Sequence, residues 1–158
     1  LFFKRHAHRI LTILIALALV FIWSNSLAGS KTSNAFSGWV EHWLKPILDP
    51  QNKLSANAFD SDVRKAAHCI EYAVLGALLV WVTASIKNVN IWLLLFIVLL
   101  AAVIDETIQI FTGRTSQVQD IWFDFFGASG GMLLAYGGKR LARRRSARRQ
   151  NQDTRTEE

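Results

Sequence analysis

Cysteine and proline are both rare in this sequence. Cys69 is the only cysteine, so no disulfide can form within the chain, and the sequence indicates neither an oxidising nor a reducing compartment. The two prolines, Pro46 and Pro50, lie close together between two apolar stretches. No internal repeat is visible, and the charged C-terminal tail is the only low-complexity segment. The chain therefore shows no sign of a disulfide framework or of a repeat architecture.

Net positive charge is almost absent outside that tail. The chain carries a formal charge of +6, but residues 139–158 hold eight Lys or Arg and three Asp or Glu, hence +5. A pI near 9.9 is therefore no evidence for nucleic-acid binding, and we expect no nucleic-acid partner. We expect residues 139–158 to form a disordered cytoplasmic tail that lies against anionic lipid head groups or only fixes the topology.

Long apolar runs occupy most of the remaining chain. Apolar residues make up 51% of the sequence and the mean hydropathy is +0.22, a composition too apolar for an ordinary soluble domain. Four stretches approach the roughly 20 apolar residues that cross a bilayer, near residues 9–28, 66–86, 91–111 and 118–138. The sequence predicts an all-α, polytopic membrane helix bundle with about four transmembrane helices. Residues 1–138 would form this single domain.

Basic residues set the predicted orientation of these helices. Lys4 and Arg5 precede the first span, Lys87 lies in the short connection between the second and third spans, and the basic tail follows the fourth. Because basic segments stay preferentially on the cytoplasmic side, both termini are predicted to be cytoplasmic. Residues 29–65 and 112–117 would then lie on the outer side, although the first of these loops also contains basic residues.

The first span has a second interpretation. Its basic start, its apolar segment over residues 10–22 and the sequence Ser26-Leu27-Ala28 resemble the three regions of a secretory signal peptide. Cleavage would leave three spans in the same orientation. We favour a retained helix, because residues 9–28 are long for the apolar region of a signal peptide.

The first outer loop contains apolar residues at helical spacing. They are Phe36, Trp39, Val40, Trp43, Leu44, Ile47 and Leu48. This pattern predicts an amphipathic helix that lies in the outer interface, with packing against the other helices as the alternative. Pro46, Asp49 and Pro50 would end it, and residues 60–62 would supply the N-cap of the second span.

Ionisable residues gather at the outer ends of the last three spans. An ionisable group at the bilayer centre costs about 2.5–3.5 kcal/mol on insertion scales, so such residues normally face the bundle interior and mark function. The three sets are Arg64, Lys65, His68 and Glu71, then Asp105, Glu106 and Gln109, then Asp120 and Asp124. At about 100° per residue, each set shares one face of its helix. The sequence therefore predicts a polar pocket, with excess acid, that opens outward.

These residues fall in three motifs that occur in the order of a known family. The motifs are Arg64-Lys-Ala-Ala-His68-Cys-Ile-Glu71-Tyr72 with Gly76, Asp105-Glu106-Thr-Ile-Gln109-Ile-Phe-Thr-Gly113-Arg114, and Ser116 before Asp120-Ile-Trp-Phe-Asp124-Phe-Phe-Gly127 with Gly131. Over residues 60–135 the chain resembles the VanZ-like family of small bacterial integral membrane proteins. It departs from the common family pattern at Thr112, where proline is usual, and at Asp124, where many members have asparagine.

The resemblance implies a location but no reaction. It implies a multi-pass protein of the bacterial cytoplasmic (inner) membrane and a link to the cell envelope. The founding member is associated with low-level resistance to the glycopeptide teicoplanin, a property that should not be transferred to this chain. No catalytic reaction is assigned to the family, so the resemblance leaves open whether the chain is an enzyme.

Ligand binding is the favoured function of the pocket. The candidate ligand-binding residues are Arg64, Lys65, His68, Glu71, Tyr72, Asp105, Glu106, Gln109, Arg114, Ser116, Asp120 and Asp124. The basic residues among them suit an anionic group, and the acids suit an amine or a cation. We therefore expect the ligand to be a membrane lipid head group or a lipid-linked envelope component.

Three alternatives remain for the same residues. In an intramembrane enzyme, His68, Glu71, Asp105 and Glu106 would be the catalytic candidates, through acid–base chemistry or a bound divalent cation; no other cofactor is expected. A proton- or ion-coupled transporter is the second alternative, although the inner halves of the spans show no polar relay. The third is a charge network that only stabilises the bundle. The sequence indicates no oligomeric state.

Overall fold

The computed structural model describes residues 2–27, 42–51, 53–83, 90–113 and 117–156. Nearly all of these residues are helical. The helices are α1 (Phe2–Leu27), a segment over residues 42–48, α3 (Ala56–Thr83), α4 (Ile91–Phe111) and α5 (Val118–Thr156). No β-strand occurs among these residues, and the all-α prediction is confirmed.

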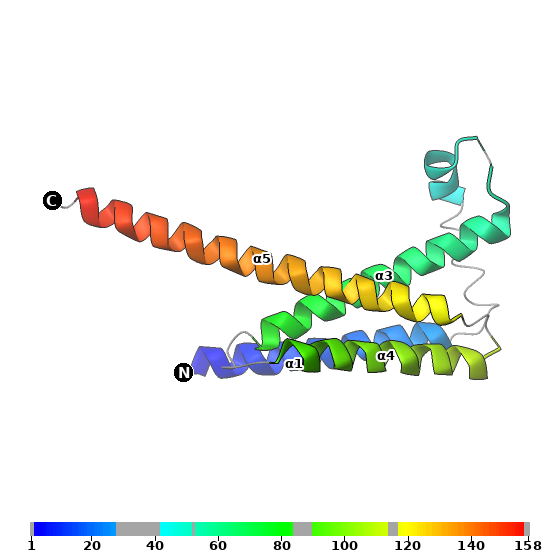
Figure 1. Ribbon diagram of the computed structural model, residues 1–158, viewed down its shortest axis with the longest axis horizontal. Helices are drawn as coiled ribbons and strands as arrows, with labels where there is room; N and C mark the ends of the chain where they lie inside the picture. Colours follow the sequence, from blue (N-terminus) through cyan, green and yellow to red (C-terminus); the bar gives the residue numbers. More distant parts are fainter. Residues whose placement is uncertain (1, 28–41, 52, 84–89, 114–116, 157–158) are drawn as a thin grey trace.

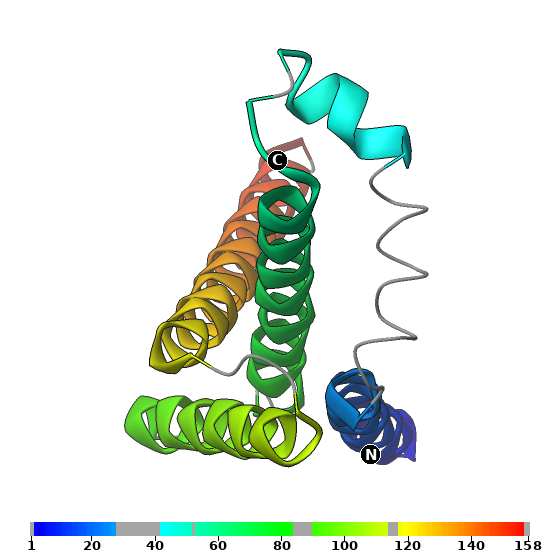
Figure 2. The same cartoon turned by 90° about the vertical axis from the view of Figure 1, so that its right-hand side faces the viewer.

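The long helices run in two opposite directions. α1 and α4 run one way and contact each other, while α3 and α5 run the other way and cross (Figures 1 and 2). The C-terminal ends of α1 and α4 and the N-terminal ends of α3 and α5 therefore lie on the same side of the bundle, on the right of Figure 1. Both chain termini lie toward the opposite side. This topology brings the three predicted sets of polar residues to one end of the bundle.

Three helices of the described chain are long and apolar enough to cross a membrane. They are Arg9–Leu27 within α1, Ala56–Thr83 and Ile91–Phe111. The fourth predicted span, residues 118–138, forms the first half of α5 and is not among the three. Large apolar side chains cover the outside of these helices; Trp92 and Phe111, for example, are 74% and 86% exposed. An exterior of this kind suits contact with lipid chains.

A small apolar core holds the helices together beneath that exterior. Ile22 of α1, Tyr72 and Leu75 of α3, Val98 of α4 and Ala128 of α5 are all buried in one cluster. Each helix therefore contributes one buried stripe, while the rest of its apolar surface points outward.

Small residues allow α3 and α5 to cross in close contact. A Cβ atom added at Gly127 would overlap the carbonyl group of Cys69, and one added at Gly131 would overlap that of Ala73. Gly76 approaches the Ala128 carbonyl in the same way from the α3 side. The four-residue spacing of Gly127 and Gly131 places both on one face, as in other close helix pairs in membranes.

The N-terminus of α3 differs from its predicted position. The helix begins at Ala56, ten residues before the predicted span, and the Ser55 hydroxyl oxygen accepts a hydrogen bond from the Ala58 amide at 3.3 Å. Residues 60–62 are thus in the helix, and the prediction that they form its N-cap is wrong. Phe59 is only 3% exposed, and its burial favours the extra helical turns.

The turn before α3 is closed by Asp49. Its carboxylate accepts hydrogen bonds from the amides of Lys53 and Leu54, at 2.9 and 2.8 Å. Because these donors favour the charged form, they hold the pKa of Asp49 below its usual value.

The basic C-terminal segment also differs from its prediction. We expected disorder after residue 138, but α5 continues without a break to Thr156. Residues 139–149 consist of Lys, Arg, Leu, Ala and one Ser, with no Gly or Pro, and most of these have high helix propensity. Lys139 also donates a hydrogen bond to the Val80 carbonyl at 2.6 Å, which fixes the start of this segment against α3.

The predicted amphipathic helix is described only in part. Residues 42–48 are helical, whereas Phe36, Trp39 and Val40 lie outside the described residues. Trp43, Ile47 and Leu48 are 61–73% exposed, so within this segment the apolar stripe is not packed as core.

Candidate functional site

A cavity of about 350 Å³ lies at the polar end of the bundle. It is lined by residues of α3, α4 and α5 and by the connection between the last two helices. The lining residues are Asn57, Ser61, Arg64, Lys65, His68, Glu106, Gln109, Gly113, Gln117, Asp120, Phe123 and Asp124. Gly113 has a φ of 69° and follows the C-cap residue Thr112, a position where glycine ends a helix without strain.

Two basic side chains, Arg64 and Lys65, line the cavity from the N-terminal part of α3, and each is paired with an acidic residue. Arg64 contacts Asp60 one turn earlier, with 3.4 Å between nitrogen and oxygen. Lys65 contacts Asp120 of α5 at 3.5 Å and lies over the Phe123 ring at 5.8 Å from its centroid. Both basic side chains remain about 30% exposed, so a ligand can reach them.

His68 occupies the centre of the acidic residues. Its Nδ1 atom lies 3.7 Å from Glu71 Oε2 on the same helix and 3.8 Å from Asp105 Oδ2 on α4. The Asp105 side chain is fully buried, whereas His68 is partly accessible from the cavity. Both carboxylates lie near the same ring nitrogen, a position from which they can orient the imidazole.

The first helix supplies polar groups that the sequence prediction missed. The Ser26 hydroxyl donates a 2.7 Å hydrogen bond to Asp105 Oδ1, and Asn25 donates one of 3.0 Å to Glu71 Oε1. Gln109 donates to the other Asp105 oxygen at 3.1 Å. Asn25 and Ser26 follow the apolar part of α1 at the outer end of the predicted span. That position is the signal from which they could have been predicted.

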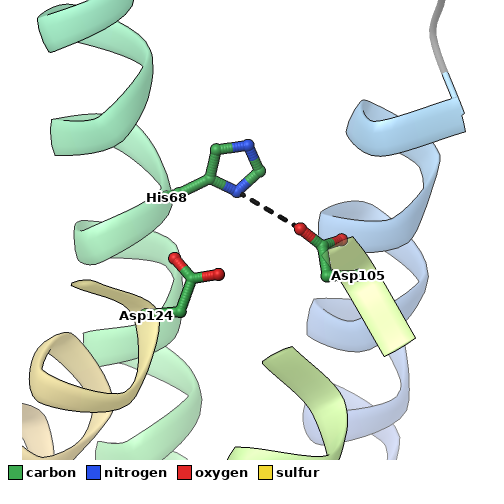
Figure 3. A group of neighbouring side chains, drawn as sticks. All are labelled: His68, Asp105 and Asp124. Atoms are coloured by element: carbon green, nitrogen blue, oxygen red, sulfur yellow. Dashed lines mark ion pairs between the residues drawn. The ribbon is translucent and has the colours of Figure 1, made fainter. Parts of the chain in front are cut away.

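Asp124 completes the cluster from α5. Its side chain points toward His68, while Asp105 approaches from α4 on the other side (Figure 3). One ligand-type atom from each of these three residues lies within 4.8 Å of the other two. Asp124 is 2% exposed, and its Oδ1 atom has no hydrogen-bond partner in the part of the chain that the structure describes.

The structure brings most of the predicted site residues together. Seven of them line the cavity, and Glu71 and Asp105 lie beside it in contact with His68. Tyr72 is completely buried in the core cluster and does not line the cavity. Arg114 and Ser116 lie outside the described residues. Asn57 and Ser61 were missed because the second helix was expected to begin after them.

The geometry defines what the site can do chemically. At one edge it offers accessible cations that can bind an anionic group, and at its inner side it offers an imidazole among carboxylates. Those groups can exchange protons or coordinate a cation. The fold and the cavity thus define a small helical protein with membrane-type helices and a polar site at one end.

Comparison with protein families identifies that class more closely. The family model described as VanZ/LLP1 matches residues 10–142, which is most of the chain and includes all of the described cavity residues. The chain therefore belongs to the VanZ/LLP1 family, as the three motifs predicted. Comparison with curated proteins and with solved structures gives no match.

Proposed function

We propose that this membrane protein binds the polar head group of a lipid, or of a lipid-linked envelope component, in the cavity at the outer end of the bundle. The main evidence is a cavity of about 350 Å³ that is lined by two partly exposed basic side chains. This cavity lies at one end of helices whose exteriors are apolar. Arg64 and Lys65 suit a phosphate or carboxylate, and the acids near His68 suit an amine or a cation.

Binding of a lipid head group in this cavity requires that the helices cross the membrane in a defined orientation. Residues 118–138 would be a fourth span, and both termini would lie in the cytoplasm of a bacterial cell with the cavity facing outward. Two observations support this. The basic part of α5 lies on the side of the bundle away from the cavity, and both termini lie on that same side (Figure 1). Basic residues favour the cytoplasmic side. Residues 42–48, with their exposed apolar side chains, would rest on the outer leaflet.

Head-group binding is tested by removing one cation of the cavity. We expect Lys65→Gln to weaken photo-crosslinking to an anionic phospholipid or a lipid-linked sugar phosphate about tenfold, because one charge-assisted hydrogen bond is lost. The measurement is a saturation curve in lipid nanodiscs. Lys53→Gln is the matched control, since Lys53 is exposed and does not line the cavity. Identical curves for the wild type and Lys65→Gln would refute head-group binding at this cavity.

A second candidate function is catalysis within the membrane. The observation that favours it is the position of His68, whose Nδ1 atom lies under 4 Å from carboxylate oxygens of both Glu71 and Asp105. Such a partly accessible imidazole can act as a general acid or base on a bound head group.

Catalysis predicts a different response from simple binding. We expect His68→Gln to lower product formation from a lipid-linked phosphate by at least about 100-fold if His68 transfers a proton in the reaction. Products are measured by mass spectrometry, and crosslinking of the same variant shows whether binding is retained. If the wild-type protein forms no product from any lipid-linked phosphate tested, catalysis is rejected as the function, whereas the proposal of head-group binding is unaffected.

A further inference from the structure

We propose that His68, Asp105 and Asp124 form a binding site for one divalent transition-metal ion at the inner edge of the cavity. The three residues come from α3, α4 and α5, so the ion would connect three successive helices (Figure 3). Such a site can be tested with the metal alone, without any lipid ligand.

The spacing of the donor atoms fits a metal after small side-chain movements. One atom of each residue lies within 4.8 Å of the other two. Zinc binds imidazole nitrogen and carboxylate oxygen at about 2.0–2.2 Å, which places its ligand atoms roughly 3–4 Å apart. Rotations of the carboxylates would therefore suffice. His68 and Asp124 line the cavity, which gives the ion a route of entry.

Hydrogen bonds from other residues already orient one of the ligands. Ser26 donates to Oδ1 of Asp105 and Gln109 donates to its Oδ2. Asn25 donates to Glu71, whose second carboxylate oxygen lies 3.7 Å from His68. Metal sites in proteins depend on outer hydrogen bonds of this kind, which fix the direction of each ligand. In this protein α1 would supply much of that outer layer.

Asp124 is the independent observation that points to a ligand. It is an ionisable side chain, 2% exposed, whose carboxylate is directed into the cluster and whose Oδ1 atom is without a hydrogen-bond partner among residues 2–27, 42–51, 53–83, 90–113 and 117–156. A buried carboxylate without a partner is costly, and a bound cation would satisfy it. The cavity cations Lys65 and Arg64 are engaged with Asp120 and Asp60.

The donor set favours a transition metal over magnesium. One imidazole nitrogen and two carboxylate oxygens suit Zn²⁺ or Mn²⁺, whereas Mg²⁺ prefers oxygen ligands and keeps several of its water molecules. Glu71 or water could occupy a further position. The same position near the cavity would also place the ion within reach of an anionic group that enters it.

The test is Zn²⁺ binding to the full chain, purified in detergent and freed of metal with a chelator. We expect one Zn²⁺ per chain by elemental analysis, and a rise in Tm on the order of 5 °C at saturating Zn²⁺. Asp124→Asn should weaken Zn²⁺ binding at least about tenfold and remove the rise in Tm, while the metal-free variant stays folded because Asn has the same shape. Ser26→Ala should weaken binding about tenfold through Asp105 alone.

Two control variants distinguish Zn²⁺ bound at this cluster from Zn²⁺ bound elsewhere on the protein. Asp62→Asn removes an exposed acid of α3 and should leave Zn²⁺ binding unchanged. Lys65→Gln should also retain Zn²⁺ even though it impairs head-group labelling, so metal binding and head-group binding can fail separately. Wild-type protein that binds no Zn²⁺, or Asp124→Asn that binds it as tightly as the wild type, would overturn the metal site. Tighter binding of Mg²⁺ than of Zn²⁺ would overturn the assignment to a transition metal.

Discussion

Gly131→Ala is expected to destabilise the protein by about 2 kcal/mol or more, although it adds a single methyl group. The added Cβ would overlap the carbonyl group of Ala73 on α3, and neither backbone can rotate away as a flexible side chain could. α3 and α5 would have to separate, and the nearby contact of Gly127 with Cys69 would loosen with them. Because α3 and α5 also carry much of the cavity lining, we expect the cavity to widen.

Gly130→Ala is the matched control for this change. Gly130 is the preceding residue of the same helix, and a Cβ there meets no atom within 4 Å. Alanine is favoured over glycine inside a helix by about 0.5–1 kcal/mol, so this variant should be as stable as the wild type or slightly more so. Reversible unfolding in detergent measures both variants. Equal stability of the two would show that α3 and α5 do not cross at Gly131.

Ser26→Leu is expected to destabilise the protein by about 3 kcal/mol and to impair head-group binding. The Ser26 side chain is fully buried; its hydroxyl donates a hydrogen bond to Asp105 at 2.7 Å and accepts one from the Gln109 amide at 3.4 Å. Leucine would remove a hydrogen bond to a charged group, worth about 1.5–3 kcal/mol, and would overfill a packed site at about 1–3 kcal/mol. The displaced Asp105 would no longer be held toward His68.

Ser24→Leu makes the same chemical change two residues away. Ser24 is exposed on the outside of α1, where a leucine side chain would face lipid or detergent without displacing a neighbour. Unfolding of both variants is followed by tryptophan fluorescence, and head-group crosslinking is measured in parallel. A Ser26→Leu protein as stable as Ser24→Leu would mean that α1 is not docked on the α3–α4 pair through this serine.

Much of the candidate site was predictable because charged residues are rare in apolar helices. Asp105, Glu106 and Gln109 stand out at the end of a segment that is otherwise apolar, and the alternation of helix direction brings them to the same end of the bundle as His68 and Asp124. Helical periodicity then assigns each set to one face. The polar end of the bundle follows from these two facts, without any knowledge of which helices touch.

Other parts of the site depended on contacts that leave no periodic trace. Asn25 and Ser26 are ordinary polar residues in sequence, and only the packing of α1 against α3 and α4 shows that they bind Glu71 and Asp105. The start of α3 was misjudged because Asn57 and Ser61 look like loop residues until the burial of Phe59 is known. Tyr72, which was expected in the site because it belongs to the motif, is buried in the core cluster beside the acidic residues and does not line the cavity.

Three motifs in the sequence identified the family. The all-α fold, the apolar exterior and the end of the bundle at which polar groups collect could also be predicted from the residues alone. These properties depend on composition and on the 3.6-residue period, which are local and can be counted. The spacing of Gly127 and Gly131 indicates a close helix contact, but only the folded structure shows that α3 is the partner and that Asp124 reaches His68 and Asp105. Those arrangements depend on how the surfaces of different helices fit together. Local sequence patterns do not specify which helix surfaces will be in contact.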